Sequence, residues 1–339
     1  MSSPTSDPQT IGSPSVEPGV ARRPRDVVLL GAQRFDETLG TLVRRLECEG
    51  LIATITAGWR EREDEDEDLR EHLESETINL RLYHRAVEVF ARDSELAKAH
   101  RAKQSTAHHK QDFYRIRLEH ELAANHVIRQ RWAPADVLEH VEAASVAAIR
   151  SLDDYHLGQC RRTQAEFELA MGLRERPVVA EQREQLAEIL GRCQGIAIAG
   201  GHVASLLNRM RLFGLDELIA NQTVFAWSGG GMVISDRLVL FHDSPPQGRG
   251  AAEILDQGLG LVPNIVMLPH PETRLRLDDA ERVSLLARRF APAACLAFPA
   301  GAHVIVRDGQ VIGSSGVTAL HADGSCALPE GCAESEVAP

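Results

Sequence analysis

A short apolar run that stops at a serine and three glycines constrains this chain more than any other feature. Residues Thr223–Trp227 are β-branched, aromatic or small and predict a buried strand, which ends directly at Ser228. This order is typical of a nucleophile elbow, where a serine occupies a strained turn between a strand and a helix. The elbow motif G-x-S-x-G is incomplete, because Ala226 replaces its first glycine. An ordinary glycine-rich turn after a strand therefore stays open as the alternative.

Further motifs flank the serine on both sides. Residues 195–202 read Gly-Ile-Ala-Ile-Ala-Gly-Gly-His, which predicts a buried strand and a glycine turn, and residues 203–213 show helical spacing of apolar residues. Downstream of the serine come Asp243, a Gly-Leu-Gly-Leu-Val-Pro run at 258–263, and His270. These motifs place a serine, an aspartate and a histidine in one half of the chain.

Together these motifs resemble the S51 serine peptidases, the aspartyl dipeptidases and cyanophycinases of the class I glutamine amidotransferase-like superfamily. The resemblance covers about residues 195–321. It implies acyl transfer to water, with Ser228 as the nucleophile and His270 as its base. It also implies that the backbone amides of Gly201 and Gly229 hold the oxyanion.

The resemblance implies an acid and a substrate-binding group as well. In the dipeptidase branch a glutamate in a Pro-Glu-Gly turn orients the histidine, and the matching turn of this chain carries Ala300 instead. The family's aspartate downstream of the elbow falls on Asp243, which becomes the candidate acid. The arginines that follow the histidine in cyanophycinase-like members are matched by Arg274 and Arg276, which would bind an acidic substrate group. No metal and no cofactor is expected.

Two functions are compatible with these residues. The first is a serine hydrolase of the S51 type that cleaves a small peptide or amide, aspartyl peptides among them. The second is a catalytically inactive member that acts as a binding or scaffold module. The second is favoured by Ala300, by Ala226 and by His202, which replaces the asparagine of the family's Gly-Gly-Asn turn. A glutamine amidotransferase proper would carry a cysteine where Ser228 stands.

The N-terminal part of the chain predicts an α/β fold. Residues 26–31 and 51–57 have the apolar pattern of strands and enclose a helical pattern at 36–49. This β-α-β unit predicts adjacent parallel strands and, with the later strands, a doubly wound, mainly parallel sheet. The α/β hydrolase domain is expected to comprise residues 25–58 and 193–326.

The C-terminal part is expected to complete this sheet. A helix is predicted at 277–290, a core strand at 294–298, and a hairpin at 303–313 around an Asp-Gly turn. Residues 1–24 are rich in Ser, Pro and Gly and are expected to be a disordered tail, and residues 327–339 form a short acidic tail.

Residues 59–192 predict a large all-helical insertion between the two parts of the sheet. The helical patterns are found at 68–94, 95–131, 135–173 and 179–192. Long amphipathic helices of mixed charge pack as hairpins or bundles, so homo-oligomer contacts are expected here. The acidic run 61–68 has no calcium-loop spacing, and no pair of helices repeats the Glu-x-x-His of di-iron bundles.

Composition excludes several classes of protein. The net charge of −12 argues against nucleic acid or an anionic membrane as the main partner. The six cysteines contain no C-x-x-C pair and predict reduced thiols rather than a zinc site or disulfides. No apolar run approaches the roughly 20 residues of a membrane span, and no signal core precedes the first strand. A cytoplasmic protein with a small peptide or amide substrate is expected.

Overall fold

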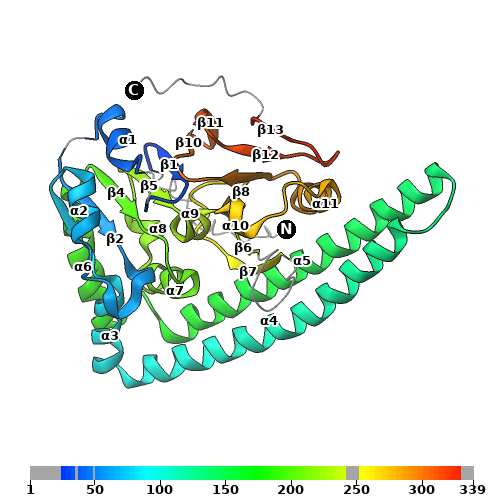
Figure 1. Cartoon of the computed structure of the whole chain (residues 1–339). Helices are drawn as coiled ribbons and strands as arrows, with labels where there is room; N and C mark the ends of the chain where they lie inside the picture. Colours follow the sequence, from blue (N-terminus) through cyan, green and yellow to red (C-terminus); the bar gives the residue numbers. More distant parts are fainter. Residues whose placement is uncertain (1–23, 35–36, 49, 242–251, 330–339) are drawn as a thin grey trace, which may run out of the picture.

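The computed structural model describes residues 24–34, 37–48, 50–241 and 252–329. Within these residues the chain forms a mixed α/β body with a large, mostly parallel central sheet (Figure 1). The candidate acid Asp243 and most of both predicted tails lie outside the described residues. No helix in the described ranges is long and apolar enough to cross a lipid bilayer.

The central sheet has seven strands in the order β11-β10-β1-β5-β4-β2-β3. Its five parallel strands are β1 (Val27–Leu30), β5 (Thr223–Trp227), β4 (Gly195–Ile198), β2 (Ile52–Ile55) and β3 (Thr77–Asn79). The antiparallel strands at one edge are β10 (His303–Arg307) and β11 (Gln310–Ser315). Every residue of β1, β2, β4 and β5 is buried, as expected of parallel strands that are covered on both faces.

Side chains of β1 alternate between two buried clusters, which lie on opposite faces of the sheet. Val27 and Leu29 belong to the larger cluster, whereas Val28 and Leu30 belong to the smaller one. Strand side chains point to opposite faces with a period of two, so both faces of the sheet are packed. This arrangement agrees with a sheet that carries helices on both sides.

Two sequence-based predictions about strand pairing are wrong. Strands β1 and β2 are parallel but not adjacent, because β5 and β4 lie between them. The strand β9 (Ala294–Phe298) does not join the central sheet but pairs with β8 (Ile265–Pro269). Local sequence patterns indicate where strands occur, whereas distant segments of the chain decide which strands become neighbours.

Strands β8 and β9 belong to a second sheet of four strands, in the order β13-β12-β9-β8. Its other strands are β12 (Thr318–Leu320) and β13 (Cys326–Ala327). The predicted acidic tail, which was expected from residue 327, therefore begins within β13. A two-stranded antiparallel sheet consists of β6 (Arg237–Leu240) and β7 (Glu253–Gln257).

The insertion is not all helical, because β3 lies within it. The prediction assigned Ile78 to a helix on its apolar spacing, but the residue pairs with Ala53 of β2. The backbone N–H of Ile52 donates to Glu76 O at 2.9 Å, and that of Leu80 donates to Thr54 O at 2.9 Å. Strand β3 therefore satisfies backbone groups of a buried strand, which would otherwise stay unpaired.

The remaining elements of this region are helices. They are η1 (Ala57–Arg62), α2 (Glu67–Leu73), α3 (Leu82–Arg92), α4 (Ser94–Arg129), α5 (Ala135–Met171) and α6 (Pro177–Arg192). The other helices of the body are α1 (Leu39–Arg45), α7 (Val203–Phe213), α8 (Leu215–Leu218), α9 (Gly229–Ile234), α10 (Pro271–Arg274) and α11 (Ala280–Phe290).

Helices α4 and α5 form a long antiparallel hairpin that extends past the body (Figure 1). At 1.5 Å per residue each helix is roughly 54 Å long. A buried ion pair holds the hairpin on the body: Arg289 of α11 donates to both carboxylate oxygens of Asp153 of α5, at 2.6 and 2.8 Å. Arg289 also donates to Tyr114 Oη of α4 at 2.9 Å.

Candidate active site

Ser228 occupies a strained turn between a buried strand and a buried helix. Strand β5 ends at Trp227, Ser228 adopts φ 49° and ψ −125°, and α9 begins at Gly229. This backbone conformation is unfavourable for a residue with a Cβ atom, so the surrounding packing must hold it. The packing leaves no space for side chains, because a Cβ on Gly230 would lie 2.3 Å from Ile198 O. The glycine run is thus required by close packing of α9 on the sheet.

His270 lies directly against the hydroxyl of Ser228. The histidine follows β8 in a left-handed conformation, with φ 59° and ψ 49°. Its Nε2 atom lies 3.0 Å from Ser228 Oγ. This separation is within hydrogen-bond reach, as a nucleophile and its general base require. The structure therefore brings together the predicted serine and the predicted histidine, which are 42 residues apart in the sequence.

The environment of His270 favours its neutral form. Burial lowers the pKa of the imidazole below its ordinary value, and the positive charge of Arg274 lowers it further. The negative charge of Glu272 acts in the opposite direction and is the smallest of the three contributions. A neutral imidazole at neutral pH can accept a proton from the serine hydroxyl.

A glycine turn after β4 lies against the serine on its other side. A Cβ on Gly200 would lie 3.2 Å from Ser228 Oγ and 3.1 Å from the backbone nitrogen of Gly229. A Cβ on Gly229 would in turn lie 3.4 Å from the nitrogen of Gly201. Among the described residues, the amides of Gly201 and Gly229 have no hydrogen-bond acceptor. Two backbone N–H groups that lie beside a serine and have no acceptor can bind the oxyanion that develops when the serine attacks a carbonyl group.

His202, which replaces the family's asparagine, caps helix α7. Its Nδ1 atom accepts a hydrogen bond from the backbone N–H of Ser205 at 3.1 Å. The backbone N–H of His202 donates to Gly58 O at 2.8 Å. The residue thus fixes the end of the glycine turn through an N-cap, a role that its position before a helical pattern could have indicated.

No carboxylate orients the imidazole within the described part of the chain, where His270 forms neither a hydrogen bond nor an ion pair with an acidic residue. The turn at 299–301, where the dipeptidases carry their glutamate, does lie beside the histidine: the backbone N–H of His270 donates to Phe298 O at 3.3 Å. Ala300 in this turn has no group that can accept a proton. The role of Asp243 stays a prediction.

Ser228 and His270 open into a cleft of about 380 Å³ at the carboxyl ends of the central strands. The other residues that line the cleft are Ala32, Gln33, Arg34, Glu37, Trp59, Asp68, Leu69, His72, Gly200, Gly201 and Trp227. Clefts at the carboxyl ends of parallel strands are the usual ligand sites of such sheets. Trp59 was not predicted as a site residue, although it lies just after the second predicted strand, where ligand sites of such sheets are found.

The two arginines that were proposed to bind substrate do not line this cleft. Arg276 forms an ion pair with Asp278, with 2.9 Å between Nε and Oδ1, and Arg274 is half-buried beside His270. The arginine that does line the cleft is Arg34. Substrate binding by Arg274 and Arg276 stays a prediction.

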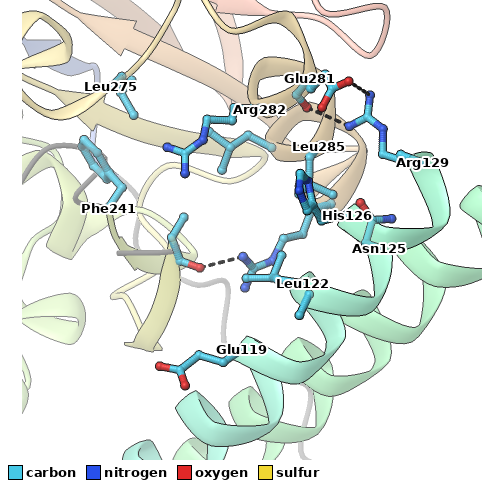
Figure 2. Close-up of a pocket in the computed structure, with 14 residues that line it drawn as sticks. Glu119, Leu122, Asn125, His126, Arg129, Phe241, Leu275, Glu281, Arg282 and Leu285 are labelled. Carbon is cyan, nitrogen blue, oxygen red and sulfur yellow. Dashed lines mark hydrogen bonds and ion pairs between the residues drawn. The ribbon is translucent and has the colours of Figure 1, made fainter. Parts of the chain in front are cut away.

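A larger cavity of about 470 Å³ lies between α4 and α11 (Figure 2). Arg129 of α4 points across it toward α11 and donates to Glu281 O at 3.3 Å, while Arg289 donates to Ala252 O at 2.6 Å. None of the described residues that line it is a serine, threonine or cysteine. The cleft at Ser228 is therefore the candidate active site, despite its smaller volume.

Comparisons with known proteins give similarity in structure only. No protein-family model matches the chain, and no curated protein matches it. The structure is similar to a peptidase from an acI-B1 Actinobacterium, with 14% identity, coverage of 88% of this chain and 91% of the other, and a TM-score of 0.44. It is also similar to a provisionally assigned peptidase E protein from Listeria monocytogenes EGD-e, with 11% identity, coverage of 86% and 98%, and a TM-score of 0.40.

Proposed function

We propose that this chain is a serine hydrolase of the S51 peptidase type, with a class I glutamine amidotransferase-like fold, that cleaves a small peptide or amide. The observation that carries the proposal is the 3.0 Å separation of Ser228 Oγ and His270 Nε2 at a strained strand-to-helix turn. The unbonded amides of Gly201 and Gly229 beside this pair support it. No metal or cofactor takes part in the proposed reaction.

The proposed reaction proceeds in two steps. Ser228 Oγ attacks the amide carbon while its proton passes to His270 Nε2, and the oxyanion is held by the two glycine amides. The carbon–nitrogen bond then breaks, and His270 gives its proton to the leaving amine. Water, activated by the same imidazole, hydrolyses the acyl-serine and restores the hydroxyl. The products are an amine and a carboxylic acid.

The proposed substrate is small because the cleft holds about 380 Å³. Recognition of an acidic substrate group by Arg274 and Arg276 is part of the proposal. Replacing both arginines by alanine should raise KM for acidic peptides and leave KM for neutral peptides unchanged. An equal effect on both kinds of peptide would refute this assignment.

A specific observation favours the alternative function. Ala300 stands where the dipeptidases carry the glutamate, and His270 lacks a carboxylate partner among the described residues. The alternative is an inactive S51-like protein that binds partners through its helical hairpin. Exposed apolar side chains at both ends of the hairpin, Trp132 at its tip with 95% accessibility and Leu169 near the end of α5 with 86%, support partner contacts along it. Homo-oligomer contacts through the hairpin are proposed for either function.

The decisive experiment measures amine release from a panel of Asp-Xaa, β-Asp-Arg, basic and neutral dipeptides by the purified protein. Ser228→Ala and His270→Ala are compared with wild type, and Ser205→Ala serves as a matched control because its hydroxyl contacts His202 rather than the proposed base. Turnover that both active-site variants lose and the control keeps would support the hydrolase. Turnover that survives in Ser228→Ala would exclude this serine as the nucleophile.

A further inference from the structure

A second polar cleft lies where the helical hairpin meets the body, apart from the site at Ser228. Its volume is about 240 Å³, and it shares no lining residue with the candidate active site. Three elements supply the polar side chains that matter here: Lys103, Lys110 and Gln111 of α4, Thr163 and Gln164 of α5, and Asn208 of α7. The cleft is therefore formed jointly by the insertion and the α/β body.

Lysine is rare in this chain, and the cleft contains two of its three lysines. Lys103 and Lys110 lie seven residues apart on one face of α4, whereas the third, Lys98, is exposed and does not line the cleft. Lys103 Nζ donates to Gln164 Oε1 at 2.7 Å and to Asn208 Oδ1 at 3.1 Å. All these partners are uncharged amides.

Lys110 has the same kind of neutral partner. Its Nζ donates to Thr163 Oγ1 at 2.7 Å. In the described ranges neither lysine forms an ion pair, although arginines form many. The two ammonium groups of the cleft are therefore hydrogen-bonded to neutral partners only, although the charges of Asp256 and Glu168 also act on Lys103.

The carboxylates of the cleft are already paired with arginines. Glu253 lies 2.9 Å from Arg115 Nε, and Asp256 lies 2.9 Å from Arg211 Nη1. Burial and, next, the positive charge of Arg211 lower the pKa of Lys103 to about 8, while the negative charges of Asp256 and Glu168 act in the opposite direction. Partial burial of an ammonium that has no ion-pair partner is unfavourable, and an anion in the cleft would reduce this penalty.

Gln111 adds a buried acceptor without a partner. Its side chain is only 6% accessible, and its Nε2 donates to Ile254 O at 3.1 Å. The Oε1 atom of Gln111 is buried and has no hydrogen-bond partner among the described residues. A buried unsatisfied oxygen is costly, so the cleft calls for an N–H or O–H group as well as a negative charge.

We propose that this cleft binds a small oxyanion that also carries a hydrogen-bond donor, the chemistry of a hydroxy acid, an amino acid or hydrogen phosphate. The anion contacts Lys103 and Lys110, and the donor contacts Gln111 Oε1. Asn208 belongs to α7, whose first residue, Val203, is separated from the glycine turn of the candidate active site by His202 alone. The proposal does not depend on the hydrolase function, because it concerns a separate cleft.

Isothermal titration calorimetry of the full chain tests the proposal with four probes at constant ionic strength: L-malate, L-aspartate, phosphate and succinate. Succinate at neutral pH lacks the donor, so it should bind at least about tenfold more weakly than L-malate. Lys103→Gln and Lys110→Gln should each weaken L-malate binding by about tenfold or more. The matched control Lys98→Gln should bind as wild type does. The affinity for phosphate is compared with the affinities for the carboxylates, and the tighter class of probe identifies the kind of anion that the cleft binds.

Gln111→Met provides the second test. It removes the acceptor at similar volume and should abolish the preference for L-malate over succinate. Lys110 is half-buried and donates one side-chain hydrogen bond, whereas Lys103 donates two, so Lys110→Gln remains informative if Lys103→Gln fails to fold, which circular dichroism would reveal. Absence of saturable binding by all four probes, or equal L-malate affinity in the Lys98, Lys103 and Lys110 variants, would overturn the proposal.

Discussion

The backbone N–H of His270 donates to the carbonyl oxygen of Phe298 across 3.3 Å. Strands β8 and β9 run parallel and end together, with Pro269 opposite Phe298. The turn that follows β9 is therefore held beside the backbone of His270, and Ala300 lies in this turn. We therefore expect a carboxylate side chain at this position to reach His270, the histidine that contacts Ser228.

Ala300→Glu should accordingly increase activity on any amide that the wild-type protein hydrolyses. An acid behind the imidazole orients the ring and stabilises the imidazolium, and serine triads that lack a competent acid lose about 10⁴ in rate. We expect kcat to rise at least about tenfold, because an introduced acid should recover only part of that 10⁴-fold loss. Ala300→Gln, of equal size but without charge, is the control. Equal kcat values for the Glu and Gln variants would show that charge at this position plays no part.

The pH dependence of the reaction should follow the lowered pKa of His270. The base is active when neutral, so kcat/KM should rise with pH through a value below the ordinary 6.5 and then level off. Arg274→Gln removes a positive charge that lowers this pKa, so the acidic limb should move to higher pH. Arg276→Gln, which is not among the causes of the shift, is the control, and the profiles are measured with a neutral peptide because both arginines are proposed to bind an acidic substrate group. If the acidic limb of the kcat/KM profile lies at the same pH in Arg274→Gln as in wild type, the proposed role of that charge is contradicted.

Gly200→Ala should impair catalysis without unfolding the protein. The new methyl group would lie 3.0 Å from Ser228 Cβ and 3.2 Å from Oγ, so the nucleophile must shift by a few tenths of an ångström. Misplacement of reacting groups by about 1 Å can cost on the order of 10² in rate, and we expect a loss of kcat approaching this size. Gly158→Ala in α5 meets no atom within 4 Å and serves as the control. Wild-type kcat in Gly200→Ala would contradict the described packing.

Arg289→Met should destabilise the whole chain. The arginine is 2% accessible and its partner Asp153 is 1% accessible, so the variant leaves a buried, uncompensated carboxylate. Loss of one partner of a buried pair costs about 3–5 kcal/mol in the free energy of unfolding. Arg288→Met removes the neighbouring arginine, which pairs with Glu142 at 3.0 Å near the surface, and should cost about 1 kcal/mol or less. Urea denaturation followed by circular dichroism measures the free energy of unfolding of both variants. Equal losses of this free energy would show that the buried pair stabilises the chain no more than the surface pair.

Much of the site could be predicted from sequence because its residues belong to local patterns. Ser228 follows an apolar run and precedes glycines, and His270 follows another apolar run, so each stands at the end of a strand. Strands β5 and β8 belong to different sheets, so the convergence of the two side chains depends on how these sheets pack together, which no local pattern shows. The charged lining of the cleft, including Arg34, Asp68 and His72, has no such local signal and was missed.

The sequence by itself determined several strands and the glycine turns, because these depend on apolar periodicity and on residues without a Cβ atom, and the resemblance of its motifs to a peptidase family indicated the serine–histidine pair. Only the tertiary structure decided the strand order, the separate sheet of β9, the short strand β3 and the anchoring of the hairpin by Arg289 and Asp153. Each of these depends on contacts between residues far apart in the chain. Which distant partner satisfies a given backbone group or buried charge is decided only when the segments pack together.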